Sequence, residues 1–150
     1  MKRLAMSSAA LLLVAASVAF ADDKADVKTA IETWGSAVAD GCASDPGKIA
    51  RLYAQDGVLW GTLSPSIRSD AAGIQDYFND ACAKLPKLTV AFKDHLVRVY
   101  GDTAIDSGTY VFSFEKDGIR ADLPARYTFV LRKTGDRWRI VDHHSSAMPK

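Results

Sequence analysis

The stretch Arg126–Pro149 constrains the fold more than any other part of the chain. Polar and apolar side chains alternate through Tyr127–Arg132 and again through Trp138–Asp142, which is the period of two β-strands. The short Gly-containing connection between these strands predicts a β-hairpin. Because the second strand ends in the polar run Asp142–Ser146, we expect the hairpin to hold polar groups on a rigid frame.

The rest of the chain divides into a helical part and a strand part. Apolar side chains at helical spacing predict helices over Lys24–Asp40, from Pro46 through Tyr53, and from a cap at Ser69 or Asp70 to Pro86. The predicted strands are Val58–Thr62, Leu88–Tyr100, Ala104–Lys116, Ala121–Lys133 and Arg137–Ser145. Helices followed by an antiparallel meander indicate an α+β fold, in one domain spanning residues 22–150.

The first residues have the three parts of a secretory signal peptide. Lys2 and Arg3 provide the positive start, Ala9–Phe20 is an apolar run, and Ala19-Phe20-Ala21 is a cleavage motif of small residues. The apolar run is shorter than the ~20 residues that span a bilayer, which disfavours a membrane anchor. We expect residues 1–21 to be removed, and the mature protein to be periplasmic or secreted with no membrane partner.

Charge and cysteine content narrow the class of partner. The full chain has a net charge of +1, and loss of Lys2 and Arg3 gives +1 − 2 = −1, so no basic field for nucleic acid is expected. The only cysteines are Cys42 and Cys82, and an oxidising compartment favours a disulfide between them. With three histidines and no Cys-x-x-Cys motif, the sequence predicts neither a metal site nor a cofactor.

Three motifs carry a family resemblance: WRIVDHHSSAMP at the end of the chain, ARYTFV before it, and LYAQDGVLWG earlier. They resemble the association domain of calcium/calmodulin-dependent protein kinase II, in particular its stand-alone bacterial relatives in the SnoaL-like group of the nuclear transport factor 2-like superfamily. The resemblance covers roughly Lys24–Pro149. It implies a cone-shaped fold, in which three N-terminal helices close a curved, mainly antiparallel sheet around a pocket.

The same resemblance implies that the other side of the sheet commonly makes a dimer. The composition of the strands also indicates a partner subunit, because three short helices cannot cover all of the apolar side chains of the strands. The residues in question are Phe92, Leu96, Tyr100, Tyr110, Phe112, Phe114, Tyr127, Phe129 and Val141. We expect a homodimer or a higher homo-oligomer.

The polar end of the hairpin supplies the first candidate ligand-binding residues. His143 and His144 are adjacent on a strand and face opposite ways, which disfavours a metal pair. Regular alternation puts His144 on the face of Trp138, Ile140 and Asp142. One histidine would line the cavity and the other the subunit interface; two purely structural histidines are the alternative.

Further candidates surround this cluster. Arg126 should approach His144 across the hairpin, where its guanidinium could bind a ligand carboxylate, or else form a surface salt bridge. Arg68 could hold an anion at a helix N-terminus, or lie in a solvated loop. The residues predicted to wall a mostly apolar cavity, with core packing as the alternative, are Trp34, Tyr53, Trp60 and Tyr77.

These observations lead to an exported dimeric module that binds a small organic molecule in the cone, a carboxylate-bearing one among the candidates. Two alternatives stay open: an isomerase or lyase of the ketosteroid-isomerase or dehydratase type in the same pocket, or a non-catalytic oligomerisation hub. Asp106, Asp142, Tyr53 and Tyr127 are chemically eligible for isomerase chemistry, yet no spacing pairs them. His95, alone on a predicted edge strand, is expected to be exposed.

Overall fold

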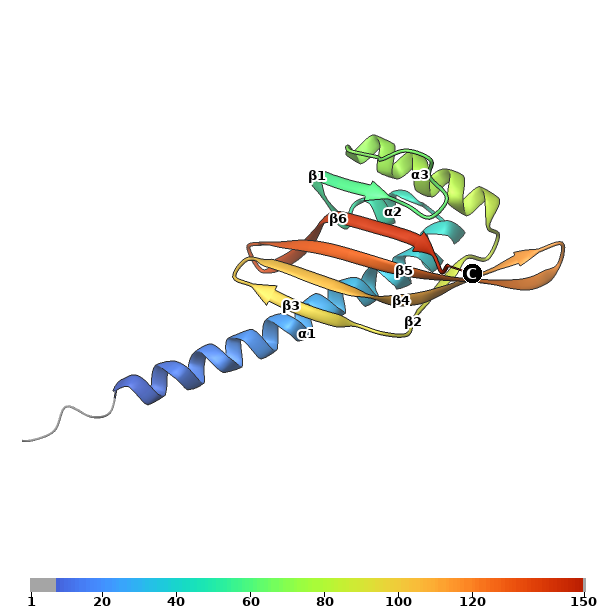
Figure 1. The fold of residues 1–150 in the computed structure, drawn as a ribbon. Coiled ribbons are helices and arrows are strands. Elements are labelled where there is room, and N and C mark those ends of the chain that lie inside the picture. The colour runs from blue at the N-terminus through green and yellow to red at the C-terminus, as the bar shows by residue number, and fades with distance from the viewer. Residues whose placement is uncertain (1–7, 150) are drawn as a thin grey trace, which may run out of the picture.

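The chain folds into a curved six-stranded sheet with the helices on one face (Figure 1). The computed structural model describes residues 8–149, with side chains described from Asp23 onward. The helices are α1 (Ser8–Ala43), α2 (Gly47–Ala50) and α3 (Ala71–Lys84). The strands are β1 (Tyr53–Trp60), β2 (Thr89–Phe92), β3 (Leu96–Tyr100), β4 (Thr103–Lys116), β5 (Ile119–Thr134) and β6 (Arg137–Ala147).

The sheet has the order β1-β6-β5-β4-β2, and β3 also pairs with β4. The pair β1–β6 is parallel, whereas the other pairs are antiparallel. The predicted hairpin is formed by β5 and β6. The predicted α+β class, with helices packed on a curved and mainly antiparallel sheet, is confirmed.

Helix α1 packs against the sheet through an apolar stripe. Val27, Ile31, Trp34 and Val38 recur at intervals of three or four residues and are at most 2% exposed. The helix continues N-terminally into the predicted signal peptide, of which residues 1–7 lie outside the described residues and 8–21 are described as backbone only. Cleavage after Ala21 therefore stays a prediction.

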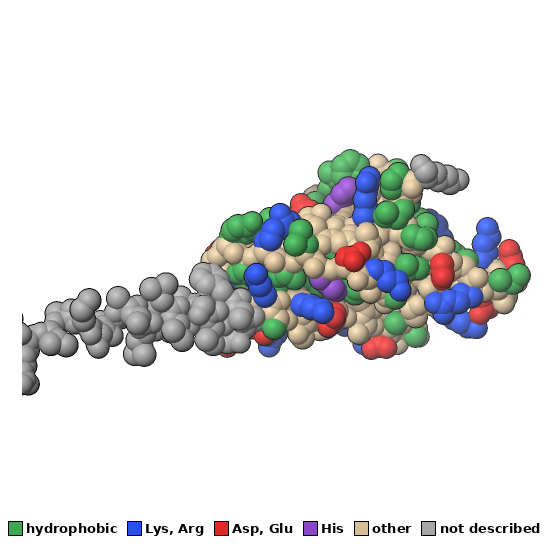
Figure 2. Space-filling model, turned by 60° about the horizontal axis from the view of Figure 1, so that its bottom comes forward, with side chains coloured by type: hydrophobic (Ala, Val, Ile, Leu, Met, Phe, Trp, Pro, Cys, Tyr) green, Lys and Arg blue, Asp and Glu red, His purple; other side chains and the backbone are tan. Residues whose placement is uncertain are grey.

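None of the helices in the described part of the chain combines the length and apolarity that a membrane crossing requires. Basic and acidic side chains are interspersed on the face of the molecule drawn in Figure 2, so this face carries no continuous basic surface.

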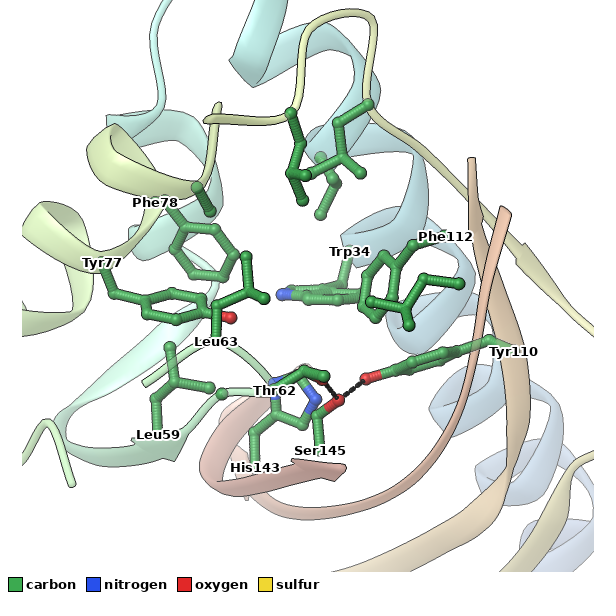
Figure 3. Close-up of a pocket in the computed structure, with 16 residues that line it drawn as sticks. Trp34, Leu59, Thr62, Leu63, Tyr77, Phe78, Tyr110, Phe112, His143 and Ser145 are labelled. Atoms are coloured by element: carbon green, nitrogen blue, oxygen red, sulfur yellow. Dashed lines mark hydrogen bonds between the residues drawn. The ribbon is translucent and has the colours of Figure 1, made fainter. Parts of the chain in front are cut away.

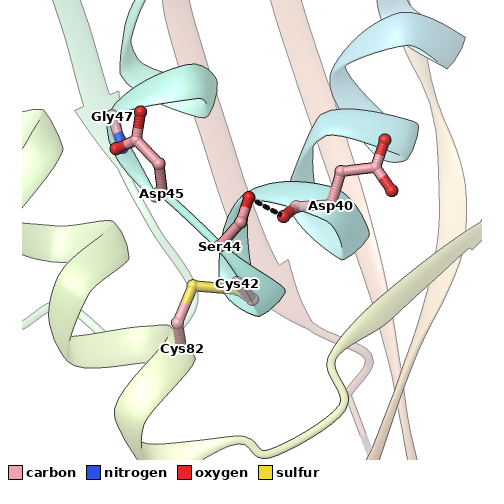
Figure 4. Close-up of a disulfide and its surroundings, with 6 residues drawn as sticks. All are labelled: Asp40, Cys42, Ser44, Asp45, Gly47 and Cys82. Carbon is pink, nitrogen blue, oxygen red and sulfur yellow. Dashed lines mark hydrogen bonds between the residues drawn. A yellow bond between two sulfur atoms is a disulfide. The ribbon is translucent and has the colours of Figure 1, made fainter.

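Helix α3 begins where the sequence predicts it. The carboxylate of Asp70 accepts a hydrogen bond from the N–H of Gly73 at 2.7 Å, which caps the first turn. The predicted disulfide is present: Cys42, near the end of α1, is joined to Cys82 in α3, with their Cα atoms 4.9 Å apart (Figure 4). The bond fixes the two helices that cover the sheet to each other.

Two predicted elements have other boundaries. The short helix ends at Ala50, and Tyr53 instead begins β1, where it pairs with Ile140 of β6. The predicted strand Leu88–Tyr100 is interrupted by Lys93-Asp94-His95, which separates β2 from β3. With these boundaries, the side chains of both Tyr53 and His95 lie inside the fold.

A β-bulge in β6 changes which side chains face the helices. Leu131 of β5 pairs with Ile140, but the preceding Val130 pairs with Asp142, so Val141 is an extra residue without an opposite partner. The alternation of the strand shifts by one residue at this point.

The shift decides the orientation of the two histidines. Trp138, Ile140 and His143 are buried, whereas Asp142 and His144 are exposed. The expectation that His144 shares a face with Trp138 and Ile140 is wrong, because it assumed unbroken alternation through the strand.

Most of the aromatic side chains of the strands pack beneath the helices. The indole of Trp34 is at the centre of this core, with ring centroids 5.1 Å from Phe129 and 6.3 Å from Tyr110. Of the strand residues expected to exceed the helical cover, Leu96 and Tyr100 remain largely exposed, at 61% and 60%. The helices therefore cover more of the sheet than expected, and the face available to a partner is less apolar than expected.

Candidate functional site

A small pocket lies between the helices and the inner face of the sheet (Figure 3). Its volume of about 30 Å³ has room for about two water molecules. The apolar side chains of the lining are Trp34, Val38, Leu59, Leu63, Phe78, Ala81, Leu85, Leu88, Phe112 and Leu123. The polar ones are Thr62, Tyr77, Tyr110, His143 and Ser145. No lysine, arginine, aspartate or glutamate is among these described lining residues.

The imidazole of His143 is the only ionisable nitrogen base among the described lining residues, and it is 2% exposed. Its ring stacks on Phe129 at a centroid distance of 3.8 Å, and its Nδ1 lies 2.8 Å from the hydroxyl of Tyr53. Burial lowers the pKa of His143 to about 3, so the ring is neutral near pH 7.

The hydroxyl of Tyr53 contacts one of the two nitrogens of that ring. Burial raises the pKa of Tyr53 well above its ordinary value, an effect that the neighbouring indole N–H of Trp34 offsets only in part. The hydroxyl therefore keeps its proton and is a suitable donor to Nδ1 of His143. In that arrangement the imidazole proton is on Nε2, which has no hydrogen-bond partner among the described residues.

A chain of hydroxyl groups closes one side of the pocket. Tyr110 donates a hydrogen bond to Ser145 at 2.5 Å, and Ser145 is in turn hydrogen-bonded to Thr62 (Figure 3). Burial raises the pKa of Tyr110, so its hydroxyl is a neutral donor. The chain ties the loop after β1 to strands β4 and β6.

The loop after β1 forms the outer wall of the pocket. The ring of Tyr77 lies against the backbone of Gly61, where an added Cβ would be 2.2 Å from the tyrosine Cζ. Leu63 lines the pocket but is 45% exposed. The side chain of Leu63 therefore has free space to move outward without displacing the core.

The structure brings some of the predicted site residues together. Trp34, Tyr77 and His143 line the pocket, and Tyr53 lies behind His143 as its hydrogen-bond partner. The indole nitrogen of Trp34 points into the pocket in Figure 3 and forms no hydrogen bond of regular geometry with the described residues.

The remaining predicted residues lie elsewhere. Arg126 precedes the buried Tyr127, so it points to the opposite face, where its Nε donates to Ser146 at 3.0 Å. The prediction that its guanidinium frames the pocket is wrong for this reason. Asp142, His144 and Trp60 also occupy this outer face, with the rings of Trp60 and His144 5.8 Å apart.

Arg68 does not line the pocket either. It pairs with Leu59 through two backbone hydrogen bonds of 2.8 Å, which close the loop after β1. Its charge is near enough to Tyr77 to offset part of the rise in that hydroxyl's pKa caused by burial. The backbone of Arg68 is therefore structural, its buried Nε has no hydrogen-bond partner among the described residues, and the predicted anion site stays a prediction.

A second polar cluster was missed by the sequence reasoning. The Nδ1 of His95 is 2.7 Å from a carboxylate oxygen of Asp106, which is fully buried, and Tyr127 donates to the backbone oxygen of Asp94 at 2.7 Å. Gly108 permits this arrangement, because a Cβ there would lie 2.0 Å from the oxygen of Asp94. The expectation that His95 is exposed is wrong, since only 13% of its side chain is accessible.

This cluster does not contribute to the pocket, because none of its members is among the lining residues. The hydroxyls of Ser145, Tyr110 and Thr62 were also missed. Ser145 could have been found from the sequence, because it is two residues beyond His143 and so shares its face. Among the residues with described side chains, no group of three or more His, Cys, Asp or Glu is placed to hold a metal ion.

Comparison with known structures shows the same fold in several proteins. A Xanthomonas campestris protein assigned to the calcium/calmodulin-dependent protein kinase II association domains is 40% identical, with a TM-score of 0.75 over 83% of this chain and 86% of that one. A nuclear transport factor 2-like protein of cystatin-like fold from Novosphingobium aromaticivorans is 19% identical, with a TM-score of 0.78 over 95% and 92%. A ketosteroid isomerase-like protein from Erwinia carotovora is 16% identical, with a TM-score of 0.66 over 85% and 98%.

The two more distant structures show the fold alone, whereas the sequence itself identifies the family. A search of curated protein sequences found no match. The family model of the calcium/calmodulin-dependent protein kinase II association domain matches residues 23–149. The chain therefore belongs to the calcium/calmodulin-dependent protein kinase II association domain family, within the nuclear transport factor 2-like fold.

Proposed function

We propose that this protein is an exported, dimeric module that binds a small organic molecule in the pocket between its helices and sheet. The observation that carries the proposal is the lining itself: an apolar wall surrounding a neutral imidazole and a few hydroxyl groups. Small-molecule sites are commonly apolar concavities with a small number of placed polar groups, and this pocket has that composition.

Binding without catalysis is favoured over an isomerase or lyase by the positions of the carboxylates. Steroid-isomerase chemistry requires a carboxylate base facing the substrate. Asp142 lies on the outer face, and Asp106 is held by His95 outside the described lining. The pocket therefore offers donors to a ligand but no carboxylate to remove a proton from it.

The ligand itself should be sought in protein purified from its native host. Native mass spectrometry is expected to show an added mass of a few hundred daltons or less on the purified chain. Ala81→Leu enlarges a buried lining residue within α3 and should abolish the adduct. Lys116→Ala, at the far end of β4, is the control and should retain it. Equal occupancy in Ala81→Leu and the unmodified chain would contradict binding in this pocket.

Export is supported by the disulfide, since such bonds persist in oxidising compartments. Amino-terminal sequencing of the mature protein should begin at Asp22. Intact Met1 on soluble cytoplasmic protein would contradict the proposal for export while leaving the proposed ligand pocket untouched.

A further inference from the structure

We propose that the pocket selects an uncharged ligand and recognises it through a carbonyl-type acceptor placed between the N–H groups of His143 and Trp34. This inference rests on the proposed ligand-binding function and adds to it the chemical class of the ligand. It replaces the carboxylate that the sequence alone had suggested.

Two lining residues carry ring nitrogens that are buried and lack a regular hydrogen bond. His143 and Trp34 are both 2% exposed, both line the pocket, and their rings meet edge to face at 5.0 Å. His143 Nε2 has no hydrogen-bond partner among the described residues, and Trp34 Nε1 forms no hydrogen bond of regular geometry there, although it lies close enough to the Tyr53 hydroxyl to lower the pKa of that group. A buried donor without a partner is unfavourable, so a ligand that supplies an acceptor gains more here than at an exposed site.

The direction of the hydrogen bonds decides that the ligand must accept. With Tyr53 donating to Nδ1 of His143, the opposite nitrogen of the ring carries a proton. An indole nitrogen is a donor only. A ketone, aldehyde, ester or amide oxygen can accept from both groups, whereas a ligand hydroxyl brings an O–H donor that neither N–H group can accept.

The absence of charge in the described lining argues against an anion. Burying a carboxylate requires a counter-charge or several charge-assisted hydrogen bonds. The described lining contains no lysine or arginine: Arg126 lies on the outer face, and Arg68 is not a lining residue, although its charge is near Tyr77. The imidazole is neutral near pH 7 and cannot replace them.

The size of the pocket restricts the ligand further. A volume of about 30 Å³ is too small for a drug-sized molecule, so binding requires outward movement of the half-exposed Leu63. The hydroxyl chain that fixes the other side of the loop stays intact in such a movement. A compact, flat ligand with one acceptor fits these requirements.

Three matched compounds test the selectivity: acetophenone, which is neutral with an acceptor; ethylbenzene, which lacks the acceptor; and benzoate, which is an anion. Titration of the purified chain at pH 7, followed by the indole N–H signal of Trp34 in nuclear magnetic resonance, gives each affinity. We expect acetophenone to bind about tenfold more tightly than either of the others. Benzoate binding as tightly as acetophenone would overturn the inference.

The adjacent histidines provide matched variants on opposite faces of β6. His143→Phe keeps an aromatic ring in the pocket but removes one of the two donors, so the preference for acetophenone over ethylbenzene should fall while ethylbenzene still binds. His144→Phe should keep the preference. The reverse result would show that the wrong histidine has been assigned to the pocket.

A measurement on the unmodified chain tests the inference even if the variants do not fold. Long-range ¹H–¹⁵N spectra should show the imidazole of His143 protonated on Nε2, and a proton on Nδ1 would overturn the inference. Equal affinity for all three compounds would refute the selectivity alone. Binding of none of them would overturn this inference, whereas the proposed ligand-binding function would be contradicted only if the natively purified chain also carried no added mass.

Discussion

At the scale of single residues, His143 shows how burial selects a chemical state. The same residue type on the outer face, His144, is exposed, although the two are neighbours in the chain. Stacking on Phe129 and the hydrogen bond from Tyr53 compensate part of the cost of removing the imidazole from water. The cost of adding a positive charge there is not compensated, and this makes the stability depend on pH.

We expect the free energy of unfolding to fall on acidification because of His143. Its pKa is about 3 in the folded chain, against about 6.5 when unfolded, so protons bind preferentially to the unfolded state between these values. The contribution is complete above about pH 6.5 and is lost as the pH falls towards 3. Between pH 7.5 and 5.0 the loss is about 2 kcal/mol.

Urea unfolding of the unmodified chain and of His143→Gln at these two pH values isolates the effect. The variant should lose about 2 kcal/mol less on acidification, whatever its stability at pH 7.5. His144→Gln is the matched control and should follow the unmodified chain. Parallel pH dependence in all three proteins would contradict a buried, neutral His143.

Asp106 is the other residue whose surroundings predict a measurable effect. Its carboxylate is fully buried and bonded to His95, with Tyr127 near the same oxygen. Asp106→Ala leaves the imidazole without its hydrogen-bond partner, and a buried polar group left unsatisfied typically costs about 1–3 kcal/mol. We expect a loss of about 1–3 kcal/mol in urea unfolding at pH 7. Tyr127→Phe removes one neutral donor and should cost about 1 kcal/mol. A loss below 1 kcal/mol for Asp106→Ala would mean that the cluster is structurally unimportant.

At the scale of secondary structure, periodicity predicted the long elements correctly and failed at the irregularities. The stripe of α1, the cap of α3 and the alternation of β5 follow from local side-chain patterns. The bulge at Val141 does not, because valine fits a regular strand as well as a bulged one. The correct strand was identified for the site, but its inward histidine was not.

The split between β2 and β3 was missed for a related reason. Lys93-Asp94-His95 leaves the ladder because the N–H of Lys93 donates to Thr109 and the Asp94 oxygen meets Tyr127, two residues far along the chain. Register between strands is set by such contacts and by the whole sheet. A single-sequence pattern contains neither, so the cluster around His95 could not be predicted.

The disulfide is the element-scale feature with the largest expected energy. Cys42 and Cys82 are separated by 40 residues, and closing a loop of this length in the unfolded chain stabilises the fold by about 4 kcal/mol. Reduction should lower the urea midpoint correspondingly, and the denatured, unreduced protein should show no free thiols. A Cys42→Ser/Cys82→Ser double variant is the control, since reductant should not affect it. Free labelling of both thiols in exported protein would contradict the bond.

At the scale of the whole molecule, the helices cover one face of the sheet and leave the other to solvent or a partner. The outer face has apolar margins at its two edges, Trp60 on β1 and Leu96 with Tyr100 on β3, and each of these is 47–61% exposed. Between them lie polar side chains such as Arg126 and His144. Packing within one subunit buries the face that the helices cover. The apolar side chains at the two margins stay exposed in a single subunit, and the proposed dimer would bury them.

The last prediction is that these margins join two copies of the chain. Sedimentation equilibrium at micromolar concentration should give the mass of two subunits or a multiple of it. Two buried apolar side chains contribute about 1.5 kcal/mol or more each, so a Leu96→Asp/Tyr100→Asp double variant should raise the dissociation constant at least about 100-fold.

Ile119→Asp provides a matched control, because Ile119 is 72% exposed but lies at the tip of the β4–β5 hairpin, away from these margins. If Ile119→Asp dissociates the dimer and the double variant does not, the interface is formed by the hairpin. If the unmodified chain is a stable monomer, the outer face has no partner of its own kind, and ligand binding in the pocket must be complete within one subunit.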